Sequence, residues 1–316
     1  MSKVIAILGP TASGKTNIGV KLAYELNGEI VSADSRQVYR GMDIGTGKDL
    51  TEYEINGKKI PYHLIDVADP NEVFDLARFQ KQAFAAIDDI LSRNKLPIIV
   101  GGTGLYLQAL VDNYKLSEID PDQKLREKLE KYSEKELLKQ IEKLNPEILL
   151  NISKSDKKNK RRLIRYVEII KQGERFDKKG GSKYDWLLVG IEWPIDILRK
   201  RIYNRLIDRF ENHDMVDEVK RLHEQGVNWQ RLENFGLEYK YIAQYLQNKI
   251  KYDEMVEKLN FASGQFAKRQ MSWYRRWEKQ GAKIFWSKDY AVIKKMIKEW
   301  QEGEAQADKD IEKAMF

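Results

Sequence analysis

The sequence predicts an α/β protein: a P-loop doubly wound parallel sheet with a helical insertion domain and a helical C-terminal part. Three observations support this prediction. Short apolar runs alternate with segments of helical periodicity over the first hundred residues, which is typical of a parallel sheet covered by helices. A glycine-rich motif follows the first apolar run, and a long charged segment without strand pattern divides the chain.

The first third of the chain contains most of the expected sheet. The apolar run 3–8 predicts a buried strand because it stops at Gly9-Pro10, and apolar residues at helical spacing follow from near Gly14. Asp75 is placed to cap a long amphipathic helix. The other elements expected here are a strand at 29–34, a hairpin at 53–64 leading into a third strand that ends at Asp66, and a strand at 96–100.

A change in composition marks the insertion. Residues 113–183 are highly charged and rich in helix formers, so we expect a helical insertion there, inside a core formed by 1–112 and 184–316. The run 184–193 resumes the sheet-like pattern. Later elements are expected as helices at 195–225, 238–247 and 253–279, a strand at 282–286 and a final amphipathic helix.

Composition excludes several classes of protein. The 316 residues are 42% hydrophobic and 33% charged, and no stretch approaches the roughly 18 apolar residues of a membrane span. The N-terminal apolar run is too short for a signal peptide, so we expect a cytoplasmic protein. The absence of cysteine excludes disulfides, cysteine–zinc sites and thiol chemistry. The three histidines are scattered along the sequence and do not form a metal site. Any metal ion must therefore be held by oxygen ligands.

Positive charge is concentrated in three places. The net charge is +7, and the basic clusters lie at 157–165, 199–209 and 268–276, the last of them interleaved with aromatic residues. Solvated helix faces would explain any single cluster. Three clusters together favour an anionic partner such as a nucleic acid.

The strongest local signal is a phosphate-binding loop. The residues Gly9-Pro10-Thr11-Ala12-Ser13-Gly14-Lys15-Thr16 fit G-x-x-x-x-G-K-[ST] between an expected strand and an expected helix. Small residues let successive backbone N–H groups point at a di- or triphosphate at the start of the helix. Lys15 adds a positive charge and Thr16 a hydroxyl ligand for Mg²⁺. The motif alone does not say whether the phosphates belong to a nucleotide.

Two more segments are expected at the same edge of the sheet. Asp34 ends one expected strand, and Gly101-Gly102-Thr103-Gly104 follows another. The carboxyl ends of parallel strands meet at one edge, where open sheets bind ligands. In isolation, Asp34 could instead cap a turn, and the glycines could serve a tight turn only.

The motifs at 9–16, 34–46, 63–66 and 101–107, in this order and spacing, closely resemble the tRNA dimethylallyltransferases, also called tRNA isopentenyltransferases. Later matches lie at 162–168, 201–205, 215–218 and 268–273. The family moves a dimethylallyl group from its diphosphate to the exocyclic amine of the adenosine just 3′ of the anticodon, with Mg²⁺ and without ATP. The zinc-finger extension of eukaryotic relatives is absent, so the resemblance implies an enzyme of bacterial type.

The resemblance implies a role for each motif. The phosphate loop would hold the diphosphate of dimethylallyl diphosphate, with Lys15 and Arg201 neutralising its charge and Thr16 placing Mg²⁺. Asp34 would be the general base and Thr103 would bind the target adenosine. The implied contacts with the tRNA anticodon stem-loop are Asp34, Ser35, Arg36, Gln37, Thr103, Arg126, Arg161, Arg162 and Arg165. We expect a monomer.

Other functions remain open at this point. A relative that prenylates free adenine nucleotides would share the loop but has no need of the insertion and three basic clusters. A P-loop kinase could use Asp66 as its magnesium carboxylate, and a non-catalytic RNA-binding protein could retain the fold. Arg201 and Arg205, on one helix with Asp208, could form surface ion pairs instead of a phosphate site.

Overall fold

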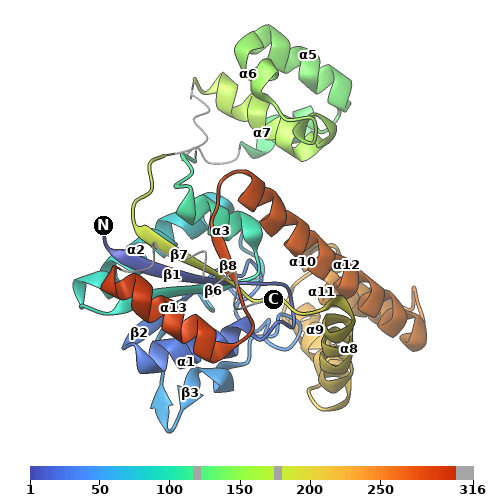
Figure 1. The fold of residues 1–316 in the computed structure, drawn as a ribbon. Helices are drawn as coiled ribbons and strands as arrows, with labels where there is room; N and C mark the ends of the chain where they lie inside the picture. The colour runs from blue at the N-terminus through green and yellow to red at the C-terminus, as the bar shows by residue number, and fades with distance from the viewer. Residues whose placement is uncertain (117–121, 174–179, 304–316) are drawn as a thin grey trace. The chain divides into compact units, whose positions relative to one another are not determined.

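The computed structural model describes residues 1–116, 122–173 and 180–303. The chain divides into two compact units, one formed by Met1–Val111 with Ser182–Phe316 and the other by Asp112–Gly181 (Figure 1). The insertion expected at 113–183 differs from the second unit by one residue at its start and two at its end.

The first unit is built on a six-stranded sheet in which every neighbouring pair is parallel. Its strands are β1 (Lys3–Leu8), β2 (Gly28–Ser32), β5 (Tyr62–His63), β6 (Leu96–Gly101), β7 (Asp185–Gly190) and β8 (Ile284–Trp286). Their order is β5-β2-β6-β1-β7-β8. Because the chain starts at a central strand and extends the sheet in both directions, the sheet is doubly wound, as predicted.

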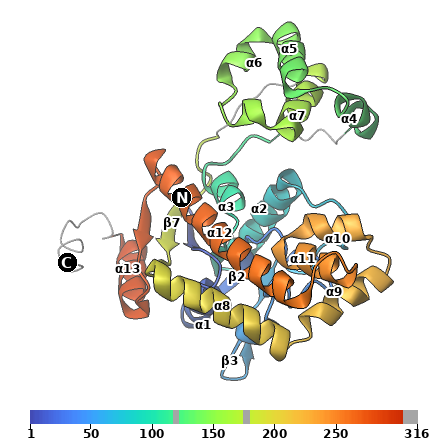
Figure 2. The same cartoon turned by 90° about the vertical axis from the view of Figure 1, so that its right-hand side faces the viewer.

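The sequence of β1 alternates between two apolar cores. Ile5 and Ile7 pack with helices α1 (Lys15–Glu25) and α13 (Tyr290–Glu302) on one face. The alternate residues of the strand pack on the other face with α2 (Leu76–Ser92), α3 (Gly104–Val111) and α12 (Tyr252–Lys279). Figures 1 and 2 show these two helical layers. A strand buried on both faces has to be apolar throughout, which explains the uninterrupted run.

The remaining elements of this unit are mostly helical. They are the 3₁₀ helix η1 (Leu50–Tyr53), the hairpin strands β3 (Glu54–Ile55) and β4 (Lys58–Lys59), and helices α8 (Ile195–Glu211), α9 (Met215–Glu224), α10 (Trp229–Phe235) and α11 (Leu237–Leu246). Asp75 caps α2 as predicted, since its carboxylate accepts a 2.9 Å hydrogen bond from the Arg78 N–H. Over the described ranges, no helix combines the length and the apolar character that a membrane crossing requires.

The structure departs most from the predicted elements in three places. The third strand ends at His63, before Asp66, because Leu64 and Asp66 adopt the left-handed conformation with φ of 62° and 56°. The helix predicted at 195–225 is two helices, broken near Asp214 with φ of 39°. Helix α10 was not predicted, although Asn228 caps it through the Arg231 N–H at 2.8 Å.

The second unit contains α4 (Gln123–Leu129), α5 (Glu134–Leu144), α6 (Pro146–Asn151), the 3₁₀ helix η2 (Asp156–Lys158) and α7 (Lys160–Lys171). It has its own apolar core, centred on Leu137, Ile141 and Leu163. Its two ends are joined, because the Asn113 carbonyl accepts from the Gly180 N–H over 2.8 Å. The Asn113 amide also donates to the Gly181 carbonyl over 2.9 Å.

Candidate active site

Three predicted segments follow three adjacent strands of the sheet. The phosphate loop follows β1, the turn with Thr103 follows β6, and the turn with Asp34 follows β2. The strands are parallel, so all three segments lie at the carboxyl edge. The structure therefore brings together side chains that are far apart in the sequence.

The phosphate loop places a cation at the start of α1. Gly14 adopts the left-handed conformation with φ of 87°, which favours glycine at this position. Lys15 begins the helix, and its ammonium group lies 3.4 Å from the Pro10 carbonyl oxygen. Burial lowers the pKa of Lys15 to about 8, while the nearby Asp34 carboxylate acts in the opposite direction. The loop is therefore a partly dehydrated site that favours an anion.

Helix α8 adds further positive charge to this loop. Arg201 donates from Nε to the Ala12 carbonyl over 2.8 Å, and Arg205 donates to the Thr11 hydroxyl. Burial and the neighbouring Arg209 lower the pKa of Arg205. Spacing of four residues puts these arginines on one face of the helix.

The alternative of surface ion pairs on α8 is wrong for these two residues. Asp208 instead lies 3.4 Å from His213, while Arg201 and Arg205 contact the phosphate loop. Trp193, just before α8, also contacts the loop through a 2.9 Å hydrogen bond from its indole N–H to the Ser13 carbonyl. Sequence reasoning missed Trp193 because nothing local distinguishes it from a core tryptophan.

Asp34 and Thr103 lie in two different turns, after β2 and after β6, that hydrogen bonds join. The Asp34 carboxylate accepts from the Arg36 N–H over 2.9 Å, so part of its role is to cap the turn after β2. The Thr103 hydroxyl accepts from the Ser35 N–H over 3.1 Å, and the Thr103 N–H donates to the Ala33 carbonyl over 3.3 Å. The carboxylate and the hydroxyl are thus held on neighbouring backbone.

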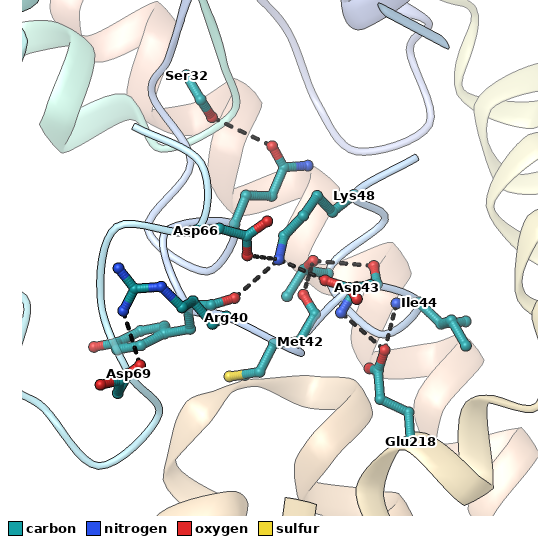
Figure 3. A network of polar contacts seen from close by, with 12 residues as sticks. Ser32, Arg40, Met42, Asp43, Ile44, Lys48, Asp66, Asp69 and Glu218 are labelled. Carbon is teal, nitrogen blue, oxygen red and sulfur yellow. Dashed lines mark hydrogen bonds and ion pairs between the residues drawn. The ribbon is translucent and has the colours of Figure 1, made fainter. Parts of the chain in front are cut away.

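The loop after the turn that holds Asp34 is anchored by Glu218 of α9, as Figure 3 shows. The fully buried carboxylate accepts hydrogen bonds from the N–H groups of Asp43 at 2.8 Å, Ile44 at 2.7 Å and Gly45 at 3.0 Å. The Tyr239 hydroxyl donates to it over 2.8 Å. Four donors compensate the burial of one negative charge.

Lys48 makes a second set of polar contacts with this loop. Its buried ammonium group lies 2.6 Å from Asp43 Oδ1, pairs with Asp66 and donates to the Tyr39 carbonyl over 2.9 Å (Figure 3). The Asp66 carboxylate is therefore paired with Lys48 in this structure, which does not favour the alternative that it binds the magnesium ion of a kinase. Gln37 is linked to the same loop by a 3.3 Å hydrogen bond to the Gly47 carbonyl.

The predicted RNA-binding arginines of the second unit differ in their surroundings. Arg126 makes a bidentate ion pair with the fully buried Glu168 at 2.7 and 2.8 Å, and Arg165 contacts the same carboxylate at 3.2 Å. Arg162 pairs with Asp156. Arg161 is exposed and has no ion-pair partner among the residues that the structure describes. Three of the four therefore take part in ion pairs within the unit itself.

Within the described ranges, no group of three or more His, Cys, Asp or Glu side chains could hold a metal ion. The Thr16 hydroxyl, next to Lys15 in α1, is a hard oxygen ligand of the type that Mg²⁺ takes together with phosphate oxygens and water. A cavity of about 850 Å³ lies beside the loop, lined by Pro10, Trp193 and Met271 among others. Lys15, Asp34 and Thr103 do not line it, so we do not place the site there.

The fold and the site define a P-loop protein with a polar, carboxylate-bearing turn beside its phosphate loop. The family model described as IPP transferase matches residues 37–277. The tRNA dimethylallyltransferase 1 of Syntrophus aciditrophicus (strain SB) is 45% identical over 304 residues, 94% of this chain and 98% of that protein. The chain belongs to the tRNA dimethylallyltransferase family of prenyltransferases.

Solved structures agree with this assignment. The full-length tRNA isopentenylpyrophosphate transferase from Bacillus halodurans superimposes with a TM-score of 0.69 at 35% identity, covering 97% of both chains. A eukaryotic dimethylallyltransferase acting on tRNA superimposes with a TM-score of 0.71 at 28% identity, covering 86% of this chain and 70% of that one. The predicted fold class and family are confirmed.

Proposed function

We propose that this protein transfers the dimethylallyl group of dimethylallyl diphosphate to the exocyclic amine of the adenosine 3′-adjacent to the anticodon of certain tRNAs, releasing diphosphate. The observation that carries the proposal is the meeting, at one sheet edge, of a cation-rich phosphate loop with the two joined turns that hold Asp34 and Thr103. We further propose that the protein acts in the cytoplasm, where its proposed tRNA substrate is found, and that it is a monomer.

The phosphate loop is the proposed donor site. As the allylic C–O bond breaks, its electron pair passes to the diphosphate oxygen, and Lys15 and Arg201 stabilise the charge that develops there. The Thr16 hydroxyl would hold a Mg²⁺ ion together with the diphosphate, and the ion would supply further charge neutralisation. Arg205, beside the same loop, adds to the positive field.

The joined turns after β2 and β6 are the proposed acceptor site. The adenosine amine attacks the allylic carbon, and its proton becomes acidic as the new C–N bond forms. Asp34 is the proposed base for that proton. Thr103 is proposed to contact the adenosine, and Ser35, Arg36 and Gln37 the adjacent RNA. The target base must leave its stack to reach this edge.

The second unit is the proposed holder of the tRNA backbone. Its basic residues have the charge density that phosphates attract. Arg161 is exposed and is the proposed direct contact, while Arg126, Arg162 and Arg165 would contact RNA in addition to pairing with carboxylates.

The test is direct transfer. The protein is incubated with unmodified tRNA, Mg²⁺ and labelled dimethylallyl diphosphate, without ATP, and the tRNA is digested to nucleosides. We expect label in adenosine, and a loss of about a hundredfold in the Lys15→Ala variant. AMP in place of tRNA serves as the comparison. Preferential labelling of AMP, or a requirement for ATP, would contradict the proposal.

A further inference from the structure

Gln270 of α12 connects two segments of the candidate site through one side chain. Its amide oxygen accepts a 2.8 Å hydrogen bond from the Thr11 N–H, and its amide nitrogen donates over 2.8 Å to the Gly102 carbonyl. The side chain is buried, with a relative exposure of 7%. One bond requires an acceptor and the other a donor, so the amide has a single favourable orientation.

The two bonded groups lie in different halves of the site. Thr11 belongs to the phosphate loop after β1, whereas Gly102 immediately precedes Thr103 after β6. One helical turn further along α12, the Tyr274 hydroxyl also donates to the Gly102 carbonyl, over 3.2 Å. Helix α12 therefore makes hydrogen bonds with both the phosphate loop and the turn after β6.

Gly102 is fitted closely to this amide. A Cβ added at Gly102 would lie 2.5 Å from Gln270 Nε2, which is shorter than the distances at which Cβ atoms contact other atoms in real proteins. A side chain at this position would force the amide to move. The glycine and the glutamine therefore form one packed arrangement.

We propose that Gln270 is a positioning residue that sets the distance and orientation between the phosphate loop, which binds the donor, and the turn after β6, which carries Thr103. This inference rests on the proposed function. Transfer requires the attacking nitrogen and the allylic carbon at roughly 3–3.5 Å and in line, and a displacement of about 1 Å can cost about a hundredfold in rate. Gln270 touches neither substrate in this role. It acts through Thr11 and Gly102.

This role makes a distinctive kinetic prediction. When the hydrogen bonds of Gln270 are lost, each substrate retains its own half of the site, so the affinity for each substrate should be preserved. The transfer step needs both substrates in register, so its rate should fall. A purely structural role would instead lower the amount of folded protein. That loss would reduce the number of binding sites and the turnover in parallel.

The experiment compares Gln270→Leu, Gln270→Glu and Gly102→Ala with the control Gln247→Leu. Leucine keeps volume without either hydrogen bond, and glutamate keeps an acceptor for Thr11 but faces the Gly102 carbonyl with oxygen. Gly102→Ala displaces the amide without removing it. Gln247 makes 3.0 Å hydrogen bonds to Glu233 and to the Ala243 carbonyl within the α10–α11 region and is a matched glutamine.

Single-turnover rates are measured at saturating tRNA and donor, normalised to sites counted by diphosphate titration. We expect the three site variants to be about ten- to a hundredfold slower, with the dissociation constants for diphosphate and tRNA within about threefold of wild type. Gln247→Leu should match wild type. Normalised rates equal to the control, or losses explained by fewer sites, would overturn the inference. Absence of transfer by the wild type would instead refute the proposed function.

Discussion

Glu218 on α9 and Ile44 in the loop after β2 are joined by a 2.7 Å hydrogen bond from the Ile44 N–H, across 174 residues of sequence. The same buried carboxylate accepts from two neighbouring backbone N–H groups and from the Tyr239 hydroxyl. One side chain therefore anchors three consecutive residues of this loop, which Lys48 also holds through Asp43 and Tyr39.

We expect Glu218→Gln to destabilise the fold by about 3 kcal/mol, because an amide NH₂ would face buried backbone donors and leave them unpaired. Urea denaturation of the full chain measures the change in unfolding free energy. Glu224→Gln, on the exposed last turn of the same helix, is the control and should be neutral. An unchanged midpoint for Glu218→Gln would show that the anchor is dispensable.

Asp34→Asn separates the two roles of this carboxylate. Asparagine can still accept the Arg36 N–H, so the turn and the melting temperature should be preserved. It cannot serve as the base, so the single-turnover rate should fall about a hundredfold to ten-thousandfold, with both substrates still bound. Asp75→Asn, at a helix cap, is the matched control. A variant that unfolds would indicate a capping role, and one of normal rate would assign proton removal elsewhere.

Lys15 should impose a pH dependence on diphosphate affinity. Its pKa in the free protein is about 8, because burial disfavours the charged amine. The amine is charged below that pH and loses its charge as the pH rises, so the dissociation constant for diphosphate should increase above pH 8, by up to about tenfold per pH unit. Isothermal titration calorimetry from pH 7 to 9 measures this.

The diphosphate also titrates, so the comparison is with Lys15→Met, which shares that contribution. The wild-type curve should steepen relative to the variant above pH 8. Parallel curves would mean that Lys15 does not change its charge in this range.

Two neighbouring arginines should behave differently. Arg161→Glu is expected to weaken tRNA binding and to reduce the slope of log affinity against log salt by about 1 to 2, since an exposed phosphate contact is reversed. Arg162→Glu places a carboxylate beside Asp156, so it should lower the melting temperature as well as weaken tRNA binding. Filter binding at several salt concentrations, with thermal melts, distinguishes the two. If Arg161→Glu binds tRNA with the affinity and the salt dependence of the wild type, Arg161 is a solvated surface residue and not an RNA contact.

The parts of the fold that the sequence predicted are those coded locally. The strand at Lys3–Leu8, the helix start near Gly14 and the cap at Asp75 each depend on a few consecutive residues. The parallel arrangement of the strands was predicted from the alternation of strands and helices. The left-handed conformation of Asp66 was not predicted, and its side chain pairs with Lys48, 18 residues away in the sequence.

The candidate site shows the same division. The phosphate loop is one continuous motif, so it was visible in the sequence. The contacts of Gln270 with Thr11 and of Arg205 with the same residue join segments about two hundred residues apart or more, and no local pattern records them. The motifs around both residues matched the family, but a match alone does not say what a side chain touches.

The hydrogen bonds of Asn113 with Gly180 and Gly181 bring the entry and exit of the helical insertion to one point. A polypeptide that leaves and returns at the same place can be lengthened, shortened or exchanged without changing the register of the strands on either side. A turn of about two to five residues would suffice to close the gap. The proposed chemistry at the sheet edge and the proposed tRNA contacts of the insertion can therefore be inherited, and engineered, as separate modules.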